Sequence, residues 1–423
     1  MTLAASFLAG AKSRLLPASI PFRFFAAAAI FHLLLWLALL AGAEHVPSFR
    51  GGPGPVLAAV HLLALGVLTT TAIGASAQLL PVATRRALAA VWPIKLVFWL
   101  TVPGTAALVV GFYTLHTPMM ILAAIATSTG LILFVLILAD NLRRAGSLPV
   151  VAAYGWAALV ALVLLVGFGL LLAFDYEIGV LPDHGAAALV HMILGGFGFM
   201  GMLALGFSHV LIPMFTLSAP PEKRLSFIEF ALAAIAVAFA AFGAFSGNTP
   251  ALTIAALIGL AAAAVHLWLM HRALAGGMRK RLGRSFVLIR ASWLLLPTTL
   301  LVGLAALHGG AGTNGPTLFG FLLVGGWLLT FLLGVLQRIL PFLASMHAVR
   351  SAGGAPPLAS ELAASSPLVL HAICHGLAVA LLAIAIAIDV RSLARLAAAI
   401  GLVGAAAFAW FVGGVVRRLV VAR

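Results

Sequence analysis

The strongest constraint in this sequence is a succession of apolar stretches that are each long enough to cross a lipid bilayer. A membrane-spanning helix needs about 20 mostly apolar residues. Stretches of that kind lie at roughly 21–42, 55–81, 91–113, 117–140, 152–174, 186–216, 226–246, 250–271, 285–308, 316–345, 366–389 and 393–416. The pattern therefore predicts an all-α integral membrane protein with about 12 transmembrane helices.

The composition leads to the same class of protein. Charged residues make up only 8% of the chain, whereas soluble domains carry roughly 25%. A surface this apolar requires lipid as its solvent, and the segments between the stretches are too short for a soluble domain. Cys374 is the single cysteine, so no intrachain disulfide can form. We expect residues 1–423 to form one polytopic membrane domain.

The net charge of +15 follows the predicted topology and does not indicate a nucleic-acid partner. If the N-terminus is cytoplasmic, all but four of the 24 Lys and Arg residues fall in cytoplasmic segments. Arg50, Arg391 and Arg395 fall outside, and Arg338 lies inside span ten. This bias fits the positive-inside rule and predicts that both termini are cytoplasmic. We expect a bacterial inner membrane, with the basic run 279–281 close to anionic lipid headgroups.

Three of the stretches share a pattern, which indicates an internal repeat. The segments 61–82, 191–215 and 319–343 each contain early glycines, then a polar residue near the inner end, then a proline. The polar residue and proline are Gln78 and Pro81, His209 and Pro213, and Gln337 and Pro341. The unit recurs about every four spans, which predicts a 4+4+4 arrangement around a pseudo-threefold axis. The alternative is that apolar glycine-rich helices resemble one another by chance.

His61 and His191 are the first candidate ligands for a cofactor. They lie about six and five residues into spans two and six, so both are roughly 8–9 Å below the outer surface. Two neutral imidazoles bind a haem iron axially or supply two ligands of a copper site. Nearby glycines, at Gly66 and within 195–198, are interpreted as room for a flat macrocycle. The alternative is that each histidine bonds to a neighbouring helix.

A second candidate site lies near the inner side. His371, Cys374 and His375 share one helical face because their offsets are three and four residues. His209 lies at a similar depth in span six. Imidazole and thiolate ligands together suit copper, haem iron or zinc. The sequence HxxCH lacks the first cysteine of a covalent haem motif, and polar packing between helices is the alternative.

The other polar residues of the spans receive weaker interpretations. Arg338 lies just inside the inner boundary, where it is placed to pair with a haem propionate or a lipid phosphate. Snorkelling to the headgroups is the alternative. Glu229 is placed near a helix end, His266 is given no special role, and His32 is interpreted as an isolated packing residue.

Together these features resemble the haem-copper oxidase subunit I superfamily and, more closely, the NnrS family. The latter are twelve-span, haem- and copper-associated membrane proteins linked to nitric oxide stress and denitrification. The resemblance is carried by the segment 61–82 and by Gly326, Trp327, Gln337, Arg338 and Pro341 of span ten. It implies the 4+4+4 arrangement, haem b and copper as cofactors, and His61 as a haem ligand with His191 as its partner.

The chain also departs from these families. Span seven has no adjacent histidine pair between residues 227 and 245, and residues 319–327 contain no histidine. Span six lacks a His-Pro-Glu pattern, and span two begins Ala58-Ala59-Val60-His61-Leu62 instead of Trp-x-x-His-Glu. Oxygen reduction and proton pumping are therefore not expected, and no catalytic residue is assigned.

The leading functional hypothesis is a haem-binding and copper-binding inner-membrane protein. It would serve electron transfer, nitric oxide metabolism or metal handling, with a respiratory or denitrification complex as partner. A secondary transporter is one alternative, since twelve spans and prolines near helix ends suit moving helices. A non-catalytic assembly subunit of a respiratory complex is the other, in which the histidines only pack.

Overall fold

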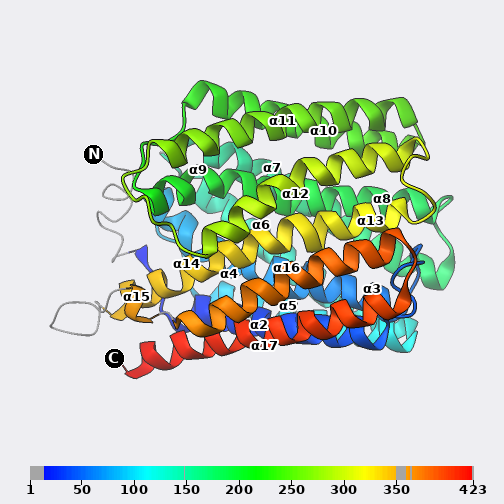
Figure 1. Cartoon of the computed structure of the whole chain (residues 1–423), viewed down its shortest axis with the longest axis horizontal. Coiled ribbons are helices and arrows are strands. Elements are labelled where there is room, and N and C mark those ends of the chain that lie inside the picture. The colour runs from blue at the N-terminus through cyan, green and yellow to red at the C-terminus, as the bar shows by residue number, and fades with distance from the viewer. Residues whose placement is uncertain (1–13, 147, 349–358, 363, 422–423) are drawn as a thin grey trace.

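The computed structural model describes residues 14–146, 148–348, 359–362 and 364–421 as a bundle of helices that run along a common direction (Figure 1). Twelve helical spans in these residues are long and apolar enough to cross a bilayer. Each overlaps one of the predicted stretches, and the described residues contain no strand. The expected all-α fold with about 12 membrane helices is therefore confirmed.

Nine of the spans among the described residues are single helices. They are α2 (Ser19–Ala41), α5 (Trp92–Thr114), α6 (Thr117–Arg143), α7 (Pro149–Ile178), α10 (Lys223–Ser246), α11 (Thr249–Ala275), α12 (Ser285–Leu307), α16 (Ser365–Ala387) and α17 (Arg391–Val421). The short helix α15 (Ala359–Leu362) lies between α14 and α16.

Three spans are interrupted by a π-helical segment. They are α3–η2–α4 (Pro55–His61, Leu62–Thr69, Thr70–Ala83), α8–η3–α9 (His184–Ile193, Leu194–Gly201, Met202–Thr216) and α13–η4–α14 (Gly315–Phe321, Leu322–Leu328, Leu329–Ala348). These are spans two, six and ten, the same three that share the sequence pattern.

Local sequence signals set many of the helix ends. The side chains of Asp183 and Asn248 accept bonds from the backbone N–H of the third residue of α8 and of α11, which satisfies orphan donors there. Pro149 occupies the first turn of α7, where its missing N–H is not needed. Gly179 and Gly247 end α7 and α10 in the left-handed conformation, with φ of 59° and 64°.

Spans two, six and ten form the centre of the bundle. In the most apolar 18 residues of spans two, six and ten, 72%, 67% and 61% of the residues are buried. In no other described span does this share exceed 50%. The π-helical segments η2, η3 and η4 contact one another. A Cβ added at Gly196 would lie 2.6 Å from the side chain of Leu323, so glycine permits the close approach of η3 and η4.

The two ends of the bundle differ in charge. Figure 1 shows the start of α2 and the end of α17 on the same side, as an even number of crossings requires. Most described Lys and Arg residues belong to segments at this side, and we call it the basic end. Arg50 and Arg395 lie at the opposite end and bond to Asn314 and Glu44. Lys12, Arg350 and Arg423, predicted for the basic end, lie outside the described residues.

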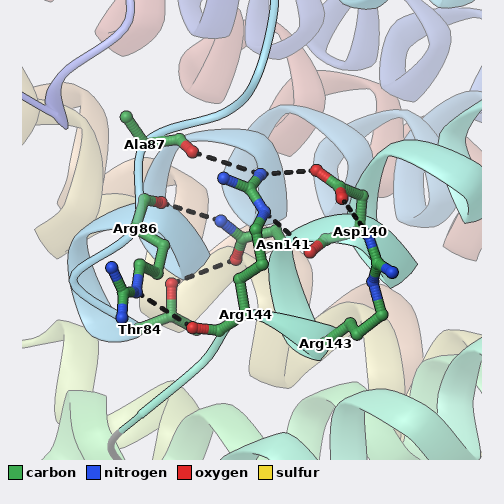
Figure 2. A network of polar contacts seen from close by, with 7 residues as sticks. All are labelled: Thr84, Arg86, Ala87, Asp140, Asn141, Arg143 and Arg144. Atoms are coloured by element: carbon green, nitrogen blue, oxygen red, sulfur yellow. Dashed lines mark hydrogen bonds and ion pairs between the residues drawn. The ribbon is translucent and has the colours of Figure 1, made fainter.

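A polar network, buried only at Thr84 and Asn141, links the end of α4 to the end of α6 at the basic end (Figure 2). Asn141 is fully buried, and its amide donates to the Arg86 carbonyl at 2.7 Å. Its oxygen accepts from the Thr84 hydroxyl at 3.0 Å. Arg144 bonds to the Asp140 carboxylate, and Arg86 Nε donates to the Arg144 carbonyl at 3.0 Å. Arg86 and Arg144, which contribute to the positive charge of the basic end, therefore also hold the loop between α4 and α5 in place.

Candidate metal centres

The structure brings His61 and His191 together, as their matched positions predict. His61 ends α3 and His191 lies near the end of α8, so both precede a π-helical segment. Their ring centres are 6.5 Å apart, and their planes lie within 28° of parallel. Phe112 of α5 packs against the His61 ring with 4.7 Å between centres. We call these two histidines the outer pair.

Backbone carbonyls orient both rings of the outer pair. His61 Nδ1 lies 3.0 Å from the Leu57 oxygen, and His191 Nδ1 lies 3.2 Å from the Leu165 oxygen. A carbonyl only accepts, so each Nδ1 carries a proton and each Nε2 keeps its lone pair. Metal-binding histidines use this arrangement, in which the second nitrogen is held by a carbonyl or carboxylate.

The distance between the ring centres of the outer pair agrees with one metal ion bound between two imidazoles. With metal–nitrogen bonds of about 2 Å, two nitrogens on opposite sides of an ion lie about 4 Å apart. The ring centres then lie roughly 6 Å apart, close to the observed 6.5 Å.

The glycines beside the outer pair do not leave room for a macrocycle, so that interpretation of the sequence is wrong. A Cβ at Gly66 would lie 2.7 Å from a side chain of α2, and one at Gly196 would lie 2.6 Å from a side chain of η4. A Cβ added at Gly195 or at Gly198 would lie 3.3 or 2.8 Å from a side chain of α7. These glycines allow helices to pack closely, and they contribute no slot for a haem.

The predicted inner cluster of His209 with His371, Cys374 and His375 does not form. The three residues of α16 are all buried, as a shared face predicts. His209 of α9 instead lies with residues of α10 and α11. The four residues share a depth along the bundle, and depth does not say which helices are neighbours.

The α16 histidines meet His32 instead, which is therefore not an isolated packing residue. The rings of His32 and His371 are 6.2 Å apart, and those of His371 and His375 are 5.7 Å apart. We call these three the His371 cluster. Each ring forms a hydrogen bond through one nitrogen. His32 bonds to the Trp36 indole (3.0 Å), His371 to the Gly404 carbonyl (3.1 Å) and His375 to the Thr330 hydroxyl (2.8 Å). The other nitrogen of each ring is buried without a hydrogen bond.

Among the described residues, one group of three brings its metal-ligating atoms within 4.8 Å of one another. It consists of His209, Glu229 and His266, and we call it the Glu229 cluster. It joins α9, α10 and α11 toward the basic end. Their side chains are 5%, 0% and 2% exposed, so water reaches none of them freely. Glu229 lies six residues into α10, roughly 9 Å along its axis.

The carboxylate of Glu229 is the centre of this cluster. Its Oε1 accepts from the Tyr154 hydroxyl of α7 at 2.8 Å and lies 2.9 Å from His266 Nδ1. Its Oε2 lies 3.1 Å from His209 Nε2. The Ser226 hydroxyl lies 3.4 Å from Nδ1 of His209. Four helices thus converge on one buried carboxylate.

Arg338 lies at the basic end and away from the outer pair. Its guanidinium lies 5.5 Å from the centre of the Phe286 ring, and its Nε donates to the Ser285 hydroxyl at 2.9 Å. Figure 1 places α14 at the end of the bundle opposite α3 and α8. The expected contact with a propionate therefore finds no support at the outer pair.

Glu229, His266 and Tyr154 are site residues that the sequence does not assign. Its pattern predicts Glu229 near a helix end and no special role for His266, whereas the structure buries both in one cluster. The available signal was that each is an ionisable residue within an apolar stretch, which by default marks function in a membrane.

Comparisons with known proteins add no relative, because no protein-family model and no curated protein matches the chain.

Proposed function

We propose that this chain is a multi-pass redox protein that holds a redox metal ion, in the first place copper, between His61 and His191. The observation that carries the proposal is the outer pair: two imidazoles 6.5 Å apart, each with Nδ1 on a backbone carbonyl and Nε2 free to bind. A bound metal would supply one-electron chemistry. The protein would use it in electron transfer, nitric oxide metabolism or metal handling for a respiratory complex.

Each residue at the pair has a distinct part. His61 and His191 are the ligands, and the carbonyls of Leu57 and Leu165 hold their rings in the binding orientation. Phe112 covers one face of His61 and limits the access of water. Because the pair lies at the end opposite the basic end, electrons would enter or leave on the outer side of the membrane.

The arrangement of the central helices supports the same proposal. The segments η2, η3 and η4 occur in spans two, six and ten and contact one another. This recurrence favours the pseudo-threefold 4+4+4 arrangement and a place near the NnrS family and haem-copper oxidase subunit I. Copper fits the outer pair without a slot for a macrocycle, so haem b and copper are separate outcomes of the test.

The test is a reduced-minus-oxidised visible spectrum of purified protein in detergent, with iron and copper counted on the same sample. We expect a sharp reduced haem band or one copper per chain, lost in His61→Ala and in His191→Ala. His45 is an exposed histidine at the same end, and His45→Ala is the matched control, which should keep the metal. Metal-free protein from a haem- and copper-replete host would end the proposal, as would full retention in both ligand variants.

A further inference from the structure

We infer that the Glu229 cluster is a second metal centre, without haem, which takes a divalent first-row transition ion. Its ligand set is two imidazoles and one carboxylate, the set that holds zinc in several hydrolases and iron(II) in non-haem oxygenases. The inference goes beyond the proposed function, because it concerns different helices and the other end of the bundle.

The contact between His209 and Glu229 is the first reason. His209 Nε2 and Glu229 Oε2 lie 3.1 Å apart, and both atoms are buried with no other polar partner. Ligands bound at about 2.1 Å to one ion lie roughly 3.0–3.4 Å from each other. A metal ion between these atoms would bind both of them, and buried polar atoms need such partners.

The surroundings of the cluster are the second reason. Tyr154 donates to Glu229 Oε1, and Ser226 lies beside Nδ1 of His209. Outer partners of this kind orient metal ligands and set their basicity. The carboxylate also balances part of the charge of a divalent ion, which a membrane interior otherwise disfavours.

The coordination of the ion would be incomplete with protein atoms alone. Three protein ligands leave at least one position for water or another small ligand, as in open metal sites. Trp293 of α12 lies beside the cluster, with its ring 6.4 Å from that of His266, and its indole N–H is buried without a partner. It is a donor available to a small ligand on the metal.

The experiment is titration of chelator-treated protein in detergent with cobalt(II), which reports its coordination through visible absorption bands. We expect one cobalt per chain in His61→Ala, which lacks the outer pair, and loss of its bands when Glu229→Gln or His209→Gln is added. Glu222→Gln is the matched control, because Glu222 precedes α10 and is exposed, and it should bind cobalt normally. Equal uptake by His61→Ala with and without Glu229→Gln overturns the inference, as does folded His61→Ala protein that binds no cobalt.

A second variant keeps the test decisive if Glu229→Gln fails to fold. Tyr154→Phe retains all three ligands and removes only the hydrogen bond to Glu229, so it should weaken cobalt binding about 10–100-fold. Unchanged affinity in Tyr154→Phe counts against the site. The outer pair is tested by a different signal. His61→Ala should lose the haem or copper signal and keep cobalt uptake at the Glu229 cluster, so the two proposed centres can be confirmed or rejected independently.

Discussion

The Glu229 cluster and the His371 cluster are both buried groups of ring nitrogens in the same bundle, and they differ in one component. In the Glu229 cluster a carboxylate lies within 3.1 Å of both histidines and accepts from a tyrosine. In the His371 cluster the three rings bond to Trp36, Thr330 and a backbone carbonyl. All three of these partners are uncharged groups.

The difference shows that a count of histidines does not identify a metal site. A metal needs ligand atoms that converge, and among the described residues only the Glu229 cluster has three such atoms within 4.8 Å. The carboxylate draws the neighbouring side chains toward a common point, whereas the rings of the His371 cluster turn toward separate partners on different helices. We therefore expect metal in the first cluster and packing in the second.

The largest effect is expected from removing the carboxylate. Glu229→Ala leaves His209, His266 and Tyr154 without their buried partner, which should cost about 3–5 kcal/mol of unfolding free energy. Denaturant unfolding in detergent, followed by tryptophan fluorescence, measures it. A loss smaller than about 1 kcal/mol would contradict the central role of Glu229.

A smaller effect is expected in the other cluster. His371→Ala removes a buried ring and the bond to the Gly404 carbonyl, so it should cost about 2–3 kcal/mol. The metal content should not change. Iron, copper and zinc counts on purified His371→Ala check this, and loss of a metal would make the two clusters alike.

The network of Figure 2 provides a baseline for a polar group without metal chemistry. Asn141→Ala removes the bonds to Arg86 and Thr84 and should cost about 1–3 kcal/mol. Cobalt uptake and the visible spectrum should match the wild type. If Asn141→Ala also lost cobalt, the effect of Glu229→Gln would reflect general damage at the basic end.

The smallest effect is expected at Cys374. Its Cβ lies 3.0 Å from the position that a Cβ at Gly404 would take, so it packs closely against α17. Cys374→Ala removes one small buried group and should cost about 1 kcal/mol. Copper and iron counts should be unchanged, and their loss would restore the thiolate ligand that the sequence suggests.

The sequence by itself determined the membrane spans, because about 20 apolar residues leave a chain no other stable solvent than lipid. It also determined the asymmetry of charge between the two ends. The closeness of His61 and His191 was predictable, since each lies at the same depth of a span with the same pattern. Their role as ligands stays a prediction.

Only the tertiary structure decided which helices are neighbours. The helical period places His371 and His375 on one face, and residue counts give their depth, but lipid is as apolar as the core. No hydrophobic gradient therefore tells which face of a membrane helix meets which partner. That is why His209 was grouped with α16, and why its contacts with Glu229 and His266 appeared only when α9, α10 and α11 were seen packed together.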